Sequence, residues 1–132
     1  MENVHTATAR PAAHVLDADV ERLRRALVAK RDALIAIGRR RSKEQRGVHD
    51  AETELADDAE HWIEQEAALR LGAFDRALLT DVNRALAKLE DGRYGQYGIS
   101  EDSGAPIPLE RLEALPWARR TAEEEERRNR AR

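Results

Sequence analysis

Residues 97–124 read YGISEDSGAPIPLERLEALPWARRTAEE, and the spacing inside this stretch decides the fold expected of the whole chain. Two residues separate Ser100 from Ser103, and two residues separate Thr121 from Glu124. Seventeen residues lie between the two pairs. With cysteine at the four positions the pattern would be Cys-x2-Cys-x17-Cys-x2-Cys, a spacing typical of zinc knuckles. The stretch therefore predicts a zinc-finger-like globule whose four ligand positions carry other residues.

Zinc itself is not expected at these positions. Zinc in knuckles takes thiolate or imidazole ligands, whereas neutral hydroxyls are poor ligands and one carboxylate cannot hold the ion. Side-chain packing must then replace a structural metal that contributes roughly 10 kcal/mol or more in the tightest cases. The candidate core residues are Ile99, Ile107, Leu109, Leu112, Leu115 and Trp117, with Tyr94 and Tyr97 beside them. The alternative is a turn-rich segment without a zinc-binding ancestor.

This stretch resembles the C-terminal zinc finger of the DksA/TraR family, bacterial proteins that enter the secondary channel of RNA polymerase. The resemblance rests on the pair spacing, on Tyr97-Gly98, Ser103-Gly104 and Pro106-Ile107, and on the segment 110–116. It covers roughly residues 20–125, and the missing cysteines are its main departure. It implies a helical hairpin in front of the globule.

Composition agrees with a helical protein. Charged residues make up 37% of the 132 residues and aromatic residues 4%, which favours long, charge-rich helices with a narrow apolar seam. The absence of cysteine excludes disulfides and thiolate metal sites. No apolar run approaches the roughly 18 residues of a membrane-spanning helix, and the N-terminus lacks a signal pattern. We therefore expect a cytoplasmic protein without a membrane partner.

Apolar periodicity predicts an antiparallel coiled-coil hairpin in residues 17–92, after a flexible N-terminal arm in residues 1–16. The first helix, 20–46, has its seam at Val20, Leu23, Leu27, Leu34 and Ile37. The second, about 56–91, has its seam at Leu71, Phe74 or Asp75, Leu78, Val82, Ala85 and Leu89. Gly72 is a weak point inside it, costing about 1 kcal/mol relative to alanine. The short connection between the helices favours antiparallel packing.

The predicted fold class is therefore mainly α. The long hairpin is followed by a small zinc-finger-like globule without zinc in residues 93–120. Residues 121–132 form a short charged C-terminal helix or a charged tail, because four glutamates precede arginines at helical spacing.

Opposite charges are segregated along the hairpin. Residues 20–46 hold ten Arg or Lys and three Asp or Glu, whereas residues 47–69 hold eight Asp or Glu and no Arg or Lys. The hairpin tip, residues 47–59, is thus acidic and the first helix basic. Such a rod is suited to entering a channel with its carboxylates first while basic side chains steer it toward an acidic rim. Alternatively, the charges only solvate a long hairpin.

By the resemblance, the tip also carries the partner-binding residues. The family motif Asp-x-x-Asp-x-Ala falls, by an ungapped count, on residues 54–59. Asp57 and Ala59 match it, Glu54 replaces its first aspartate, and Asp58 adds a further carboxylate. The resemblance implies that Asp57 comes closest to the polymerase active centre and perturbs the initiation complex without performing chemistry. Arg70 is a further possible polymerase contact.

The leading hypothesis is a transcription regulator, not an enzyme, that inserts its acidic tip into the secondary channel of RNA polymerase. One alternative is a structural or adaptor hairpin without the polymerase role. Another is a transcript-cleavage-type accessory factor whose tip carboxylates hold a catalytic Mg2+. Direct DNA binding is not expected, because the acidic segment repels phosphates. Two basic positions that some family members use for guanosine tetraphosphate fall on Phe74 and Asp81, so a response to that nucleotide is doubtful.

Overall fold

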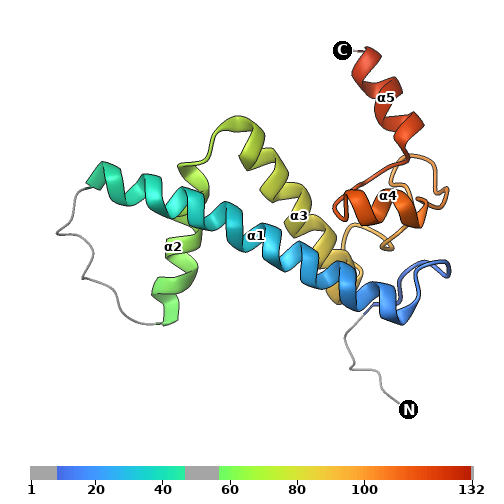
Figure 1. The fold of residues 1–132 in the computed structure, drawn as a ribbon, viewed down its shortest axis with the longest axis horizontal. Coiled ribbons are helices and arrows are strands. Elements are labelled where there is room, and N and C mark those ends of the chain that lie inside the picture. The colour runs from blue at the N-terminus through green and yellow to red at the C-terminus, as the bar shows by residue number, and fades with distance from the viewer. Residues whose placement is uncertain (1–8, 47–56, 132) are drawn as a thin grey trace. The chain divides into compact units, whose positions relative to one another are not determined.

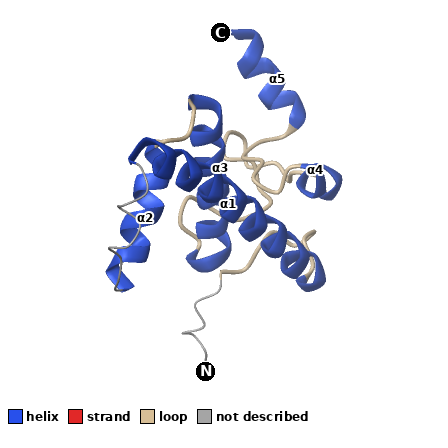
Figure 2. Cartoon of the chain, turned by 60° about the vertical axis from the view of Figure 1, so that its left-hand side comes forward, coloured by secondary structure: helices blue, strands red, loops and turns tan. Residues whose placement is uncertain are grey.

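The computed structural model describes residues 9–46 and 57–131, and these residues are mainly helical, as predicted (Figure 1). The helices are α1 (Asp17–Arg46), α2 (Asp57–Leu69), α3 (Ala73–Asp91), α4 (Leu109–Ala114) and α5 (Ala122–Ala131). Within the described ranges no strand forms, and the only bridge pairs Ile99 with Pro106 (Figure 2). The chain divides into a terminal unit, up to Val28 and from Asp81 onward, and a middle unit, Ala29–Thr80.

The terminal unit combines the start of α1, the end of α3 and the predicted globule. The seam residues Leu23, Leu27, Val82, Ala85 and Leu89 are all buried, which confirms the apolar periodicity here. In the globule, Tyr97, Ile107 and Leu112 are fully buried, whereas Tyr94 is 52% exposed and not a core residue. The Tyr97 hydroxyl donates to the carbonyl oxygen of Pro116 over 2.8 Å, and burial raises its pKa. The globule thus has a packed apolar centre.

Residues 9–16 differ from the expected flexible arm, because they pack against the globule. Ala12 and Val15 are buried, and the Ala12 amide donates to the carbonyl oxygen of Tyr97 over 2.9 Å. Gly98, at φ +94°, faces both side chains, and a Cβ there would meet Val15 at 3.0 Å. Ala12 and Val15 pack there without belonging to a helix, so their burial does not appear as a periodic apolar pattern in the sequence.

The middle unit is built on the contact of α1 with α2. Its core holds Leu34, Leu71 and Leu79, with Ile37, Ala68 and Leu78 packed against it. Gly38 lets the two helices approach closely, because a Cβ at this position would overlap the carbonyl oxygen of the buried Ala67.

The expected second helix of the hairpin is not continuous, and this corrects the sequence-based prediction. It breaks at residues 70–72, so that α2 and α3 are separate helices. Guanidinium groups satisfy the freed carbonyls: Arg41 donates to the oxygen of Arg70 over 3.2 Å, and Arg76 to the oxygen of Leu71 over 2.9 Å. Capping of this kind stabilises a helix end. Of the two alternatives for one seam position, Phe74 is 80% exposed and does not pack, whereas Asp75 is half-buried.

Replacing Gly38 with alanine is expected to destabilise the middle unit by about 1–3 kcal/mol, the usual cost of overpacking. The reason is that the added methyl group clashes with a backbone oxygen, which only a shift of α2 can relieve. Gly72→Ala is the control, because no atom lies within 4 Å of the added Cβ. Urea unfolding followed by circular dichroism measures both variants. Equal stabilities of the two variants would contradict the close helix approach.

Candidate functional site

The first pair of former ligand positions lies in a tight loop at residues 100–105. The Ser100 amide donates to the carbonyl oxygen of Ala105 over 2.8 Å, and the Gly104 amide donates to the carbonyl oxygen of Ser100 over 3.0 Å. Gly104 has φ +80°, a conformation that glycine adopts without steric cost. The amides of Asp102 and Ser103 both donate to the Ser100 hydroxyl. This turn presents both serine hydroxyls to the start of α5.

The second pair forms the N-terminal cap of α5. The Glu124 amide donates to the Thr121 hydroxyl over 3.3 Å, and the Thr121 amide donates to the Glu124 carboxylate over 2.9 Å. This reciprocal arrangement is a capping box, which needs Ser or Thr followed three residues later by Glu or Gln. The Thr-x-x-Glu pattern of residues 121–124 is therefore the sequence signal for this cap.

The Glu124 carboxylate joins the two pairs. Ser100 Oγ donates to one carboxylate oxygen over 2.6 Å, and Ser103 Oγ donates to the other. Glu124 is only 8% exposed. The hydrogen bonds from Ser100 and Ser103, together with that from the Thr121 amide, lower the pKa of Glu124 to about 2. All four former ligand positions thus meet around one carboxylate, which links the loop to α5.

The chemistry of these four groups does not fit zinc. Two serine hydroxyls, one threonine hydroxyl and one carboxylate include neither thiolate nor imidazole, and both carboxylate oxygens already accept hydrogen bonds. In the described part of the chain, no group of three or more His, Cys, Asp or Glu side chains is arranged to hold a metal ion. The knuckle is therefore closed by hydrogen bonds to Glu124.

A second carboxylate, Glu101, anchors the knuckle to α3. It accepts from Arg84 over 2.7 Å and from Arg119 over 3.1 Å, and it lies 2.8 Å from the Lys88 ammonium group. The Lys88 side chain is only 3% exposed. Burial raises the pKa of Glu101, but the hydrogen bonds from Arg84, Lys88 and Arg119 outweigh it and lower the pKa to about 2. No sequence motif predicts this cluster, because its members lie far apart in the sequence.

Both carboxylates make the stability of the protein dependent on pH in the acid range. Each has a folded-state pKa of about 2, below its ordinary value of 4.5. Their stabilisation is therefore fully present above about pH 5 and lost progressively as the pH falls from 4.5 toward 2. Urea unfolding between neutral pH and pH 2.5 measures this loss. In Glu124→Gln, the free energy of unfolding should depend less on pH in that window. An unchanged pH dependence would contradict the stabilising role of the Glu124 carboxylate.

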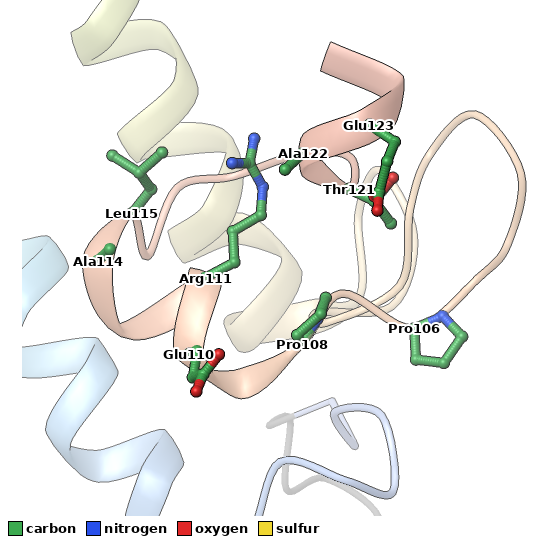
Figure 3. Close-up of a pocket in the computed structure, with 9 residues that line it drawn as sticks. All are labelled: Pro106, Pro108, Glu110, Arg111, Ala114, Leu115, Thr121, Ala122 and Glu123. Carbon is green, nitrogen blue, oxygen red and sulfur yellow. The ribbon is translucent and has the colours of Figure 1, made fainter. Parts of the chain in front are cut away.

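A shallow groove of about 530 Å³ lies between α4 and the start of α5 (Figure 3). Its walls come largely from proline, alanine and leucine side chains, and Arg111 extends along it. The Arg111 guanidinium donates to the carbonyl oxygen of Arg120 over 2.9 Å, which ties α4 to the segment before α5. The one hydroxyl in the lining belongs to Thr121, which caps α5. The lining thus offers no nucleophile with a neighbouring base.

The predicted tip falls only partly within the described residues. Glu54 lies outside them, whereas Asp57, Asp58 and Ala59 lie in the first turn of α2. Arg70 follows the end of α2, where its guanidinium pairs with Glu66 over 3.2 Å. Its partner-binding role and that of the tip remain predictions.

These features define a class of protein: a helical chain whose zinc-knuckle fold is closed by a carboxylate instead of a metal. No family model matches the chain. It is 31% identical over 114 residues to the RNA polymerase-binding transcription factor DksA of Caulobacter vibrioides, a match that spans 86% of this chain and 78% of that protein. The chain therefore belongs to the DksA family.

Two further comparisons support this assignment. The structure of transcription factor DksA2 from Pseudomonas aeruginosa matches with a TM-score of 0.60 and 28% identity, covering 92% of each chain. General stress protein 16O of Bacillus subtilis is 57% identical over 49 residues, but that match spans only 28% of the relative. Within residues 9–46 and 57–131, no helix is both long and apolar enough to cross a membrane.

Proposed function

We propose that this chain regulates transcription by binding RNA polymerase and inserting its acidic tip into the secondary channel. The observation that carries the proposal is the match over 86% of the chain to a factor named for RNA polymerase binding. The tip residues are Glu54, Asp57, Asp58 and Ala59, and Arg70 is an additional contact. The protein acts in the cytoplasm and performs no chemistry of its own.

The physical basis of the tip's action is its concentration of negative charge. Residues 47–69 hold eight carboxylates and no cationic side chain. Carboxylates near a catalytic centre that binds metal ions and nucleotide phosphates change the local potential, which is strong where water is excluded. Asp57, the residue that matches the second aspartate of the family motif, is expected to have the largest effect.

A response to guanosine tetraphosphate is not part of this proposal. At the two positions in question the chain has Phe74, which is exposed, and Asp81. Burial raises the pKa of Asp81, an effect that Arg119, 3.5 Å away, partly offsets. Neither an apolar ring nor a carboxylate supplies the positive charge that a phosphate group needs. Titration with the nucleotide should therefore leave polymerase binding unchanged.

The first experiment is co-purification with core RNA polymerase, combined with transcription initiation assays. Asp57→Asn should still bind polymerase but lose most of the effect on initiation. Asp32→Asn, which removes an exposed carboxylate from α1, is the matched control and should behave like wild type. Failure of the wild-type protein to associate with polymerase would overturn the proposal. Cleavage of backtracked RNA that depends on Asp57 or Asp58 would instead favour the transcript-cleavage role.

The position of the tip can be tested separately, because the chain contains no cysteine. A single cysteine introduced by Thr53→Cys provides a unique attachment point for a cross-linker beside the tip and leaves every tip carboxylate in place. Cross-links to the residues that line the secondary channel are the expected result. Cross-links confined to other polymerase surfaces would contradict insertion.

A further inference from the structure

Three exposed cationic side chains on α1 make no ion pair or hydrogen bond with another described residue. They are Arg39, Arg40 and Lys43, and all are exposed. Several other arginines form ion pairs within the fold: Arg22 lies 2.7 Å from Glu113, and Arg120 lies 2.9 Å from Asp102. These three cations, which fall within five residues, therefore take no part in the ion pairs that join the described residues.

The packing of α1 keeps these three charges on its solvent side. At about 100° per residue, Arg39, Arg40 and Lys43 fall within an arc of about 100° of the helix surface. Other residues of the same turns face α2: Gly38 contacts Ala67, and Ser42 lies 3.5 Å from Glu66. The three cations cannot turn toward α2 without breaking these contacts. Hereafter they are called the basic cluster.

We propose that the basic cluster is a docking surface for an acidic patch on the protein partner, and that it speeds association. This inference rests on the proposed function, because RNA polymerase is taken as the partner. Exposed cations attract an opposite charge over roughly a Debye length, about 8–10 Å at moderate salt. Complementary charges of this kind raise association rates more than they lengthen the lifetime of a complex.

The charge pattern favours an acidic protein surface over a nucleic acid. A polynucleotide carries phosphates along its whole length, so a strand that runs beyond the three cations meets further protein charges. The sequence that follows α1 is acidic, with eight carboxylates and no cationic side chain in residues 47–69, and carboxylates repel phosphates. An acidic patch on a protein ends where its side chains change, so it can match the basic cluster without meeting the acidic segment.

The test measures association and dissociation rates of the full chain with core RNA polymerase at low and at high salt. The test variant reverses the basic cluster: Arg39→Glu, Arg40→Glu and Lys43→Glu. We expect this variant to associate about tenfold more slowly than wild type at low salt. The difference should become smaller at high salt, and the dissociation rate should change little. A neutral variant with glutamine at the three positions should show a smaller loss in the same direction, and circular dichroism verifies that both variants fold.

A charge-matched control separates a local surface from net charge. Arg10→Glu, Arg127→Glu and Arg130→Glu change the net charge equally at exposed positions elsewhere and should slow association far less. If wild type binds polymerase and both triple reversals associate at equal rates, the basic cluster is not a docking surface, and the proposed function stands. If wild type does not bind polymerase, both fall. Binding of wild type to duplex DNA or RNA that the cluster variant loses would overturn the assignment of an acidic protein patch.

Discussion

Glu101→Ala is expected to lower the free energy of unfolding of the terminal unit by about 3–5 kcal/mol, the cost of removing one partner from a buried ion pair. The loss is large because the Lys88 ammonium group, 3% exposed and 2.8 Å from Glu101, would remain buried without its carboxylate. Arg84 and Arg119 would lose the same partner, but they are about one-third exposed and can be hydrated. Urea unfolding at neutral pH measures the change.

The double variant Glu101→Ala with Lys88→Met isolates this cause. Methionine fills the space of the lysine stem without a charge, and a buried ion pair replaced by apolar side chains is often neutral for stability. The double variant should therefore recover most of the stability that the single variant loses. Two results would show that the cluster does not hold the knuckle to α3. One is a free energy of unfolding of the single variant within about 1 kcal/mol of the wild-type value. The other is a double variant that is no more stable than the single variant.

Cysteine at all four former ligand positions is expected to create a zinc site. The variant combines Ser100→Cys, Ser103→Cys, Thr121→Cys and Glu124→Cys, positions that already converge through hydrogen bonds. Structural zinc contributes as much as about 10–16 kcal/mol of apparent binding free energy in zinc-finger peptides at neutral pH. The variant should bind one equivalent of zinc and melt well above wild type. A chelator should bring it below wild type, because the bonds to Glu124 are lost.

The control moves only the fourth cysteine by one residue. Glu125 pairs with Arg120 over 3.1 Å instead of facing Ser100 and Ser103, so Glu125→Cys in place of Glu124→Cys should bind zinc far more weakly. Elemental analysis and melting with and without chelator compare the two. Equal zinc affinity in both variants, or no zinc in the first, would mean that the four positions do not retain knuckle geometry. Wild type should contain no zinc and should ignore the chelator.

The knuckle was predictable from the sequence because its spacing survives the loss of the ligands. The role of Glu124 was only partly accessible, since the capping box explains its bond to Thr121 but not its contacts with two serines in a distant loop. The anchoring role of Glu101 was not accessible at all. Its partners Lys88 and Arg119 lie 13 and 18 residues away in the sequence, and no helical spacing relates them.

The break between α2 and α3 shows why propensity alone misjudged the hairpin. Gly72 is a weak point in the sequence, but its cost of about 1 kcal/mol relative to alanine does not end a helix by itself. The break is stabilised by side-chain contacts: Arg76 caps the carbonyl of Leu71, five residues earlier. From α1, Arg41 caps the carbonyl of Arg70, 29 residues away, and Gly38 admits Ala67. Contacts between residues so far apart in the sequence leave no local pattern.

The most direct test of a knuckle closed by a carboxylate is the pKa of the Glu124 side chain in the folded protein. Nuclear magnetic resonance of the side-chain carboxyl carbon, followed from neutral pH into the acid range, measures it. A pKa of about 2 is expected, because Ser100, Ser103 and the Thr121 amide all donate to the ionised form. A value at the ordinary 4.5 would mean that these bonds do not hold the knuckle closed.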